Sequence, residues 1–142
     1  MRRSRRMFSW LALGFVAVLI GIQLVPYGRD HSSPTGGRTI AWDSPRTEQL
    51  MREACLDCHS NLTSWPWYSN VAPISWLVQH DVDEGRAQLN LSTDAVELDE
   101  MIEAVREESM PPWQYKPAHP GARLSSQDKE DLIRGLEATF GR

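Results

Sequence analysis

The chain has 142 residues, a length that suits one small domain together with an additional segment. It carries 15 basic and 19 acidic residues, for a net charge of −4, and four of the arginines fall within positions 2–6, so the rest of the chain is more acidic still. Proteins bind nucleic acid mainly by neutralising its phosphates with basic side chains. The composition therefore argues against a nucleic-acid partner and is compatible with a basic protein partner.

The N-terminal residues predict a membrane anchor. Residues 1–7 (MRRSRRM) form a basic segment, and residues 8–25 (FSWLALGFVAVLIGIQLV) contain no charged side chain. About eighteen residues is close to the lower limit for crossing a bilayer core of about 30 Å, and longer than the apolar region of a typical signal peptide. No small-x-small cleavage site follows, so we expect an uncleaved anchor rather than a removed signal. The preceding arginines place the N-terminus in the cytoplasm and the rest of the chain outside it.

A flexible tether is expected after the anchor. Residues 26–42 are rich in Gly, Ser and Pro and show no apolar periodicity, a composition that is typical of a linker. Residues 43–142 remain for folding, which is a normal size for one domain.

The first half of this domain predicts two helices. One begins with Asp43 or Ser44 as the N-cap and Pro45 in the first turn, and its apolar face continues to the two cysteines of the chain. The other begins at Pro73, turns Ile, Leu and Val side chains inward, and ends at Gly85.

The second half of the domain predicts two more helices. Asp94 and Glu97 have the spacing of a capping box and should open the third helix. Ser125, with Asp128 three residues later, should open the fourth helix, which stops at Gly141. No segment alternates between apolar and polar residues as a half-buried strand does. We therefore predict an all-α domain whose Trp and Pro residues lie in long loops.

Two cysteines and a histidine at the end of the first predicted helix carry the strongest chemical signal. Cys55 and Cys58 are the only cysteines of the chain, and His59 follows them directly (CLDCH). At this spacing both sulfurs lie on one side, where they can add to the two vinyl groups on one edge of a haem. His59 is then placed to bind the iron, and CxxCH is the signature of c-type haem attachment. The motif predicts one covalently attached haem c per chain.

The two cysteines could also serve without a haem. They could form a short structural disulfide or a thioredoxin-like redox pair, but such a pair normally belongs to a βαβ pattern, which this sequence lacks. A closed zinc site needs four ligands, and besides Cys55, Cys58 and His59 only three scattered histidines are present. Haem attachment is therefore the preferred interpretation.

The sixth position of a haem iron has five candidate ligands, which are Met110, Met101, Met51, His80 and His119. Met110 lies in EESMPPWQY, where two prolines forbid further helix and hold an extended loop that can present a thioether. Met51 and Met101 lie on apolar helical faces, where methionine usually fills the core. The two histidines could instead hydrogen-bond a haem propionate or a backbone carbonyl. We predict Met110, with His80 as the runner-up.

Aromatic residues follow the CLDCH motif closely. Trp65, Trp67, Tyr68 and Trp76 could form an electron path or could cover the haem, and we prefer packing because a porphyrin is a large apolar body. Arg86 could pair with a propionate, although a solvated charge at a helix end accounts for it equally well.

The exported residues resemble a known family, the small bacterial haem-binding domain proteins, which have one membrane anchor and one CxxCH motif. CHSN, WPWYS, SWL, H, EGR, LN and MPP occur in the same order and at similar spacing. The resemblance implies a cytochrome c-like domain with one haem, on the periplasmic side of a bacterial inner membrane. It implies Cys55 and Cys58 as attachment sites, His59 as the proximal ligand and Met110 as the distal ligand, and His80 also matches a motif position.

Two positions depart from the family pattern. TDAVELDEM follows LNLS where an aromatic residue is expected, and Ser109 precedes MPP where a glycine is expected nearby. Neither departure touches a predicted ligand, so both concern the local shape of a loop.

Two classes of function follow. The first is an electron carrier, anchored in membrane lipid through residues 8–25, in which both axial positions of the iron are filled and an unidentified redox protein is the partner. The second is a haem enzyme, or a gas or peroxide sensor, in which the distal position is open or its ligand leaves. The single haem motif, with no obvious distal His/Arg pair beyond His80 and Arg86, favours electron transfer. A thiol-disulfide oxidoreductase without haem is the third alternative.

Overall fold

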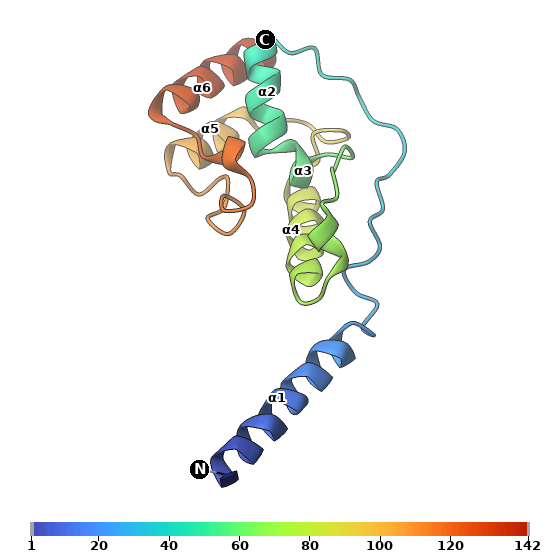
Figure 1. Ribbon diagram of the computed structural model, residues 1–142. Coiled ribbons are helices and arrows are strands. Elements are labelled where there is room, and N and C mark those ends of the chain that lie inside the picture. Colours follow the sequence, from blue (N-terminus) through green and yellow to red (C-terminus); the bar gives the residue numbers. More distant parts are fainter. Residues whose placement is uncertain (1, 142) are drawn as a thin grey trace. The chain divides into compact units, whose positions relative to one another are not determined.

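The computed structural model describes residues 2–141, which form helices and loops without a strand, as the sequence predicted (Figure 1). The α-helices are α1 (Arg2–Ile22), α2 (Pro45–Ala54), α3 (Leu56–His59), α4 (Ile74–Gln88), α5 (Leu98–Arg106) and α6 (Ser126–Phe140). Two short 3-10 turns lie at Trp67–Asn70 and Pro120–Ala122. This part of the chain is therefore all-α.

The chain divides into two compact units. The first contains the residues up to Ser32 together with Trp65–Asp81, and the second contains Ser33–Ser64 and the residues from Val82 onward. The first unit thus holds α1 and the beginning of α4, and the second holds the remaining helices.

Helix α1 has the length and composition of a membrane span. Residues Arg5–Ile22 form an exposed stretch of 18 residues that is apolar after Arg5 and Arg6, and it extends about 27 Å at 1.5 Å per residue. The helix ends at Ile22, so the last three residues of the predicted apolar segment, 23–25, lie beyond it.

Two of the predicted helix starts are confirmed. The Ser44 hydroxyl accepts a hydrogen bond from the Thr47 N–H and caps α2, and Ser125 forms a reciprocal capping box with Asp128 at the start of α6. These two helices pack closely, because a Cβ on Gly135 of α6 would lie only 2.0 Å from the Thr47 hydroxyl of α2.

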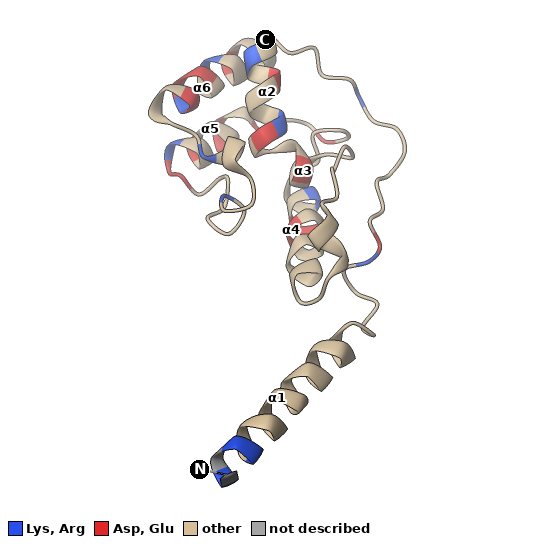
Figure 2. Cartoon of the chain, viewed as in Figure 1, with Lys and Arg blue, Asp and Glu red and all other residues tan. Residues whose placement is uncertain are grey.

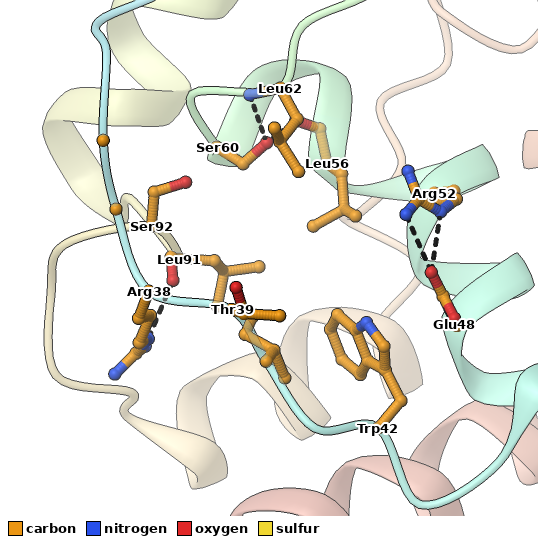
Figure 3. A pocket seen from close by; sticks show the side chains of 13 residues that line it. Arg38, Thr39, Trp42, Glu48, Arg52, Leu56, Ser60, Leu62, Leu91 and Ser92 are labelled. Atoms are coloured by element: carbon orange, nitrogen blue, oxygen red, sulfur yellow. Dashed lines mark hydrogen bonds and ion pairs between the residues drawn. The ribbon is translucent and has the colours of Figure 1, made fainter.

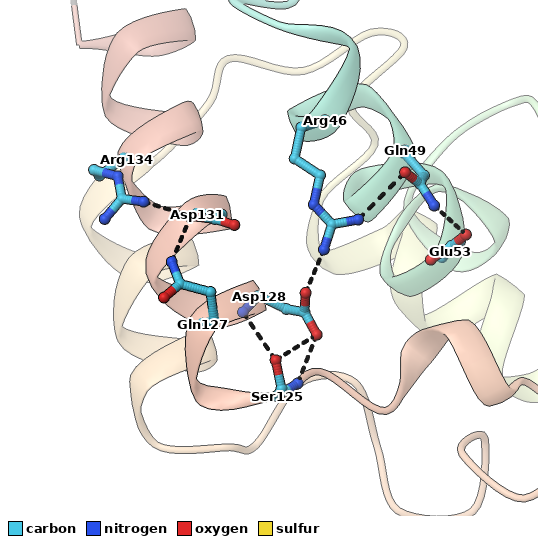
Figure 4. A network of polar contacts seen from close by, with 8 residues as sticks. All are labelled: Arg46, Gln49, Glu53, Ser125, Gln127, Asp128, Asp131 and Arg134. Carbon is cyan, nitrogen blue, oxygen red and sulfur yellow. Dashed lines mark hydrogen bonds and ion pairs between the residues drawn. The ribbon is translucent and has the colours of Figure 1, made fainter.

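A polar contact joins the same two helices. Arg46 of α2 pairs with Asp128, the residue that also completes the capping box of α6 (Figure 4). Beneath these contacts the second unit has one apolar core, formed by Leu50, Met51, Leu56, Leu91, Ile102, Val105, Leu132 and Leu136.

The predicted start of the third helix is wrong. Helix α5 begins at Leu98, and its N-cap residue Glu97 makes no side-chain capping bond. The carboxylate of Asp94 instead accepts hydrogen bonds from the Asn90 N–H (2.7 Å) and the Thr93 hydroxyl (2.9 Å). Asp94 therefore closes the turn before the helix and is not available to cap it.

The predicted end of the second helix is also wrong. Helix α4 continues through Gly85 to Gln88. The first predicted helix, in turn, is interrupted at Cys55, so that the CLDCH motif forms a separate short helix, α3. Both differences lie at the candidate site.

Candidate cofactor site

The CLDCH motif folds as a single turn after α2. Cys55 leaves the helical conformation, with φ of −131°, while its N–H still donates to the Met51 carbonyl (2.9 Å). The N–H groups of Cys58 and His59 then both donate to the Cys55 carbonyl, at 3.2 and 2.9 Å. The two cysteines are half-buried thiols with no disulfide between them. Because Cys55 itself lies outside the helical conformation, the common side for the two sulfurs that the sequence interpretation requires stays a prediction.

Helix α4 supports this turn from outside. Gly85 lies so close that a Cβ on it would be 2.6 Å from the Cys58 carbonyl oxygen. The neighbouring Arg86 donates to the Ser60 carbonyl (3.0 Å) and the Thr63 hydroxyl (2.9 Å). Arg86 therefore holds the segment that follows the motif, whereas its sequence context suggested either a propionate partner or a solvated charge.

The imidazole of His59 is oriented by the segment after α4. Its Nδ1 donates to the Leu89 carbonyl oxygen at 3.1 Å, and the Leu91 N–H donates to the His59 carbonyl at 2.8 Å. In the tautomer that donates from Nδ1, Nε2 keeps its lone pair. A backbone carbonyl that fixes one ring nitrogen is the usual support of a histidine that binds metal through the other. The position and tautomer of His59 thus fit an axial ligand.

A cavity of about 260 Å³ gathers several of the predicted residues. Cys55, His59 and Met110 line it together, along with Met51 and Met101. The remaining lining residues are Ala54, Gln88, Leu89, Leu91, Asp94, Ala95, Glu97, Glu100, Ala104, Val105 and Leu136. The cavity therefore unites the first cysteine, the histidine and all three candidate methionines, with apolar walls and exposed carboxylates at α5 and the preceding turn.

Met110 reaches the cavity from the loop that ends α5. Glu108 has a left-handed conformation, with φ of +59°, and the Met110 N–H donates back to the Ala104 carbonyl at 3.2 Å. A helix commonly ends with such a left-handed residue, usually glycine. Glu108 occupies this place, next to Ser109 where the family pattern led us to expect a glycine. The next residue, Pro111, is buried.

Asp57 ties the Met110 loop to the CLDCH motif, a contact that sequence reasoning missed. Its carboxylate accepts from the Tyr115 hydroxyl (2.9 Å) and from the Ser64 N–H (2.9 Å). The Tyr115 ring in turn stacks on His119 at a centroid distance of 3.6 Å, and His119 Nδ1 contacts the Tyr115 carbonyl at 3.0 Å. The predicted alternative ligand His119 therefore supports Tyr115.

His80, the other histidine considered as a distal ligand, belongs to the first unit. So do the four aromatic residues that follow the CLDCH motif, Trp65, Trp67, Tyr68 and Trp76. His80 is exposed on α4. Trp65 stacks on His31 at 4.5 Å, Trp67 is 79 % exposed and packs edge-on against Tyr68, and the Trp76 ring is half-buried. Trp65, which was expected to cover the haem, thus packs against His31 of the same chain.

The electrostatics of the motif do not suit a thiol redox pair. Burial, with a smaller contribution from nearby Cys58, raises the pKa of the Cys55 thiol to about 12. Redox-active cysteines instead have a lowered pKa, because the thiolate is the attacking group.

Within residues 2–141 no group of three or more His, Cys, Asp or Glu side chains is arranged to hold a metal ion.

A second cavity, of about 360 Å³, lies beside residues 36–42 (Figure 3). Arg38 lines one side of it and donates to the Leu91 carbonyl at 2.9 Å, and Trp42 and Leu56 form apolar walls. None of the residues predicted to bind the cofactor lines it.

The chain matches a known protein family over most of its length. The sequence model of a family described as haem-binding domain matches residues 17–138. No curated protein and no solved structure shows significant similarity to the chain.

Proposed function

This chain belongs to the haem-binding domain family, and we propose that it is a membrane-anchored periplasmic c-type cytochrome that carries one haem and transfers electrons. One observation supports this function best: a single cavity brings together Cys55, His59 and Met110. These residues would supply an attachment point and two axial ligands from two separate segments of the chain, the CLDCH turn and the loop after α5.

The two thiols are the proposed attachment points. Each S–H of Cys55 and Cys58 would add across one vinyl group of the haem, which leaves a thioether and no leaving group. The helical turn that starts at Cys55 holds the thiols three residues apart, and the close approach of Gly85 fixes the backbone of Cys58. The turn is thus shaped before attachment.

His59 and Met110 are the proposed axial ligands. His59 presents Nε2 because Leu89 holds Nδ1, and Met110 presents a thioether from a loop that Tyr115 fastens to Asp57. The haem, when bound, supplies a one-electron ferric–ferrous couple. Side chains held in place on both sides keep reorganisation small, and a methionine ligand raises the potential above that of two histidines.

The arrangement of the chain supports a periplasmic location. Helix α1 is long and apolar enough to span a bilayer, and arginines lie only at its start. By the positive-inside rule that end stays in the cytoplasm, which puts residues after Ile22 on the opposite side.

A second candidate function has its own supporting observation. Met110 also lines a cavity of about 190 Å³ together with Lys116, Arg123 and Lys129. A thioether with space on a second side can leave its ligand position without displacing the core. In that case the protein would be a haem enzyme, or a sensor of gases or peroxide, with a labile distal ligand.

Carbon monoxide distinguishes the two candidates, because it binds ferrous haem only where the distal position is free. We expect the reduced absorption spectrum of the wild-type protein to be unchanged by carbon monoxide and that of Met110→Ala to shift. Met101→Ala, which removes a thioether from the same cavity, and His80→Ala are the controls and should behave like wild type. A shift in His80→Ala alone would assign the distal position to His80, and a shift in the wild type would favour the sensor or enzyme.

Covalent attachment is tested on a denaturing gel. We expect haem staining to remain with the polypeptide after denaturation, because thioethers survive it. Cys55→Ser and Cys58→Ser should each retain less stain than wild type, and the double variant should retain none. Loss of stain from the wild-type band would reject the c-type assignment while leaving haem binding itself in place.

A further inference from the structure

The segment that follows α1 is fastened to the loop before α4. The side-chain amide of Gln23 donates to the Ala72 carbonyl (2.9 Å) and accepts from the Ala72 N–H (3.0 Å). Gly28 is buried with φ of +81°, and a Cβ on it would lie 2.7 Å from backbone atoms of Ser75. These residues all belong to the first unit, so the loop and the end of α1 form one packed structure.

The Gln23 contact limits the distance between this loop and the end of the apolar helix. Gln23 directly follows Ile22, the last residue of the span, so Ala72 lies within one side chain and one hydrogen bond of it. A bilayer has a hydrocarbon core of about 30 Å and a total thickness of about 40–45 Å, which leaves about 5–8 Å of headgroup layer on each side. When α1 spans the membrane, Ala72 falls in or next to that layer.

The loop and the start of α4 have the surface chemistry that such a layer accepts. The sequence contains no Asp, Glu, Lys or Arg between Asp57 and Asp81, and the ribbon of α4 is uncoloured by charge until its second half (Figure 2). Within residues 65–81, the part of this stretch in the first unit, the exposed large apolar side chains, with their exposed fractions, are Trp67 (79 %), Val71 (43 %), Ile74 (49 %) and Leu77 (45 %). Tryptophan is enriched where membranes meet water.

Three of these apolar side chains lie close in sequence to Ala72, the residue that Gln23 holds. Val71 directly precedes Ala72, Ile74 follows it by two residues, and Leu77 lies one helical turn further along α4. We propose that residues 65–77 contact the headgroup layer of the bilayer through these exposed apolar side chains. The chain then meets lipid twice, once through α1 and once through residues 65–77. The inference rests on the membrane-spanning part of the proposed function.

Photo-crosslinking tests the inference in the full-length holoprotein. A benzophenone amino acid, p-benzoylphenylalanine, replaces one aromatic residue at a time, and the protein is placed in vesicles of phosphatidylethanolamine and phosphatidylglycerol. Trp67 is the test position, Phe15 within α1 is the reference for the membrane interior, and Trp113 is the control. Trp113 matches Trp67 in residue type and exposure, at 80 % against 79 %, but belongs to the second unit.

After irradiation, lipid adducts are counted by mass spectrometry. We expect adducts at Phe15 and Trp67 and several-fold fewer at Trp113. Two outcomes would overturn the proposed lipid contact of residues 65–77 and leave the anchor intact. In the first, adducts form at Phe15 but are no more frequent at Trp67 than at Trp113. In the second, Trp67 gives chain-to-chain products without lipid. An absence of adducts at Phe15 would overturn the anchor, and the inference with it.

Discussion

Tyr115 and Asp57 are the residues through which the Met110 loop is held against the CLDCH motif, across 58 positions of sequence. A hydrogen bond to a charged group contributes about 1.5–3 kcal/mol to stability. Both side chains are only half-buried, so water can replace part of this contact. We therefore expect Tyr115→Phe to lower the free energy of unfolding by about 1 kcal/mol. The ring that stacks on His119 is retained. The freed loop should let carbon monoxide shift the reduced absorption spectrum, which we expect to stay unchanged in wild type.

The control for this variant lies in the same loop. Trp113→Phe changes an exposed aromatic residue two positions away and should leave both stability and carbon monoxide binding unchanged. A destabilised Tyr115→Phe whose reduced spectrum carbon monoxide leaves unchanged, as in wild type, would show that Tyr115 supports the fold without positioning Met110.

At the scale of single residues the sequence predicted the members of the site better than their supports. Local motifs predict Cys55, Cys58, His59 and Met110; three of them line one cavity, and Cys58 is not among its lining residues. Their roles in attachment and ligation stay predictions. The partners that orient them, such as Leu89 for His59, act through backbone carbonyls. Every residue has such a carbonyl, so side-chain identity gives no signal for it.

At the scale of elements, the contact of α4 with the motif makes a specific prediction. A Gly→Ala change inside a helix normally stabilises it by about 0.5–1 kcal/mol. In Gly85→Ala the new Cβ would lie 2.6 Å from the Cys58 carbonyl oxygen and 2.9 Å from its Cβ, so the helix or the turn must move. We therefore expect a lower melting temperature and less haem per polypeptide.

Ala87→Gly on the exposed side of the same helix is the matched control, because it measures the effect of helix propensity alone. It should lower stability by about 0.5–1 kcal/mol and leave the haem content at that of wild type. A more stable Gly85→Ala variant with full haem content would contradict the close packing of α4 on the motif.

Helix boundaries were predictable where the local signal had no competitor. Ser125 and Asp128 cap α6 as expected, whereas Asp94, at the same spacing from Glu97, bonds instead to Asn90 and Thr93. The pairs Ser125/Asp128 and Asp94/Glu97 have the same spacing but behave differently, because the Asp94 carboxylate is occupied by the backbone N–H of Asn90. Gly85 was expected to end α4 but lies inside it. A glycine is needed there because a Cβ would collide with the backbone of Cys58.

At the scale of the whole molecule, the anchor predicts where the protein is found. We expect the full-length chain to stay in the membrane fraction after a high-salt wash, at its unprocessed length. An arginine at the centre of a span costs about 2.5–3.5 kcal/mol, so Leu13→Arg combined with Val16→Arg should release or mislocalise the chain. Leu24→Arg, just beyond the end of α1, should not. Release of the wild type by salt, or a shortened product, would argue against the anchor.

The contact between His59 and Leu89 spans 30 positions and has a consequence for biogenesis. On the proposed topology the chain crosses the membrane progressively, and segments nearer the N-terminus emerge and fold first. The thiols of CLDCH therefore reach the periplasm before the residue that orients the imidazole. The contact of Gly85 with Cys58 and the hydrogen bond from His59 to Leu89 both form only when residues 85–91 have followed, so attachment to the shaped turn waits for them. On the proposed topology, haem attachment therefore follows the export of the chain at least as far as Leu91.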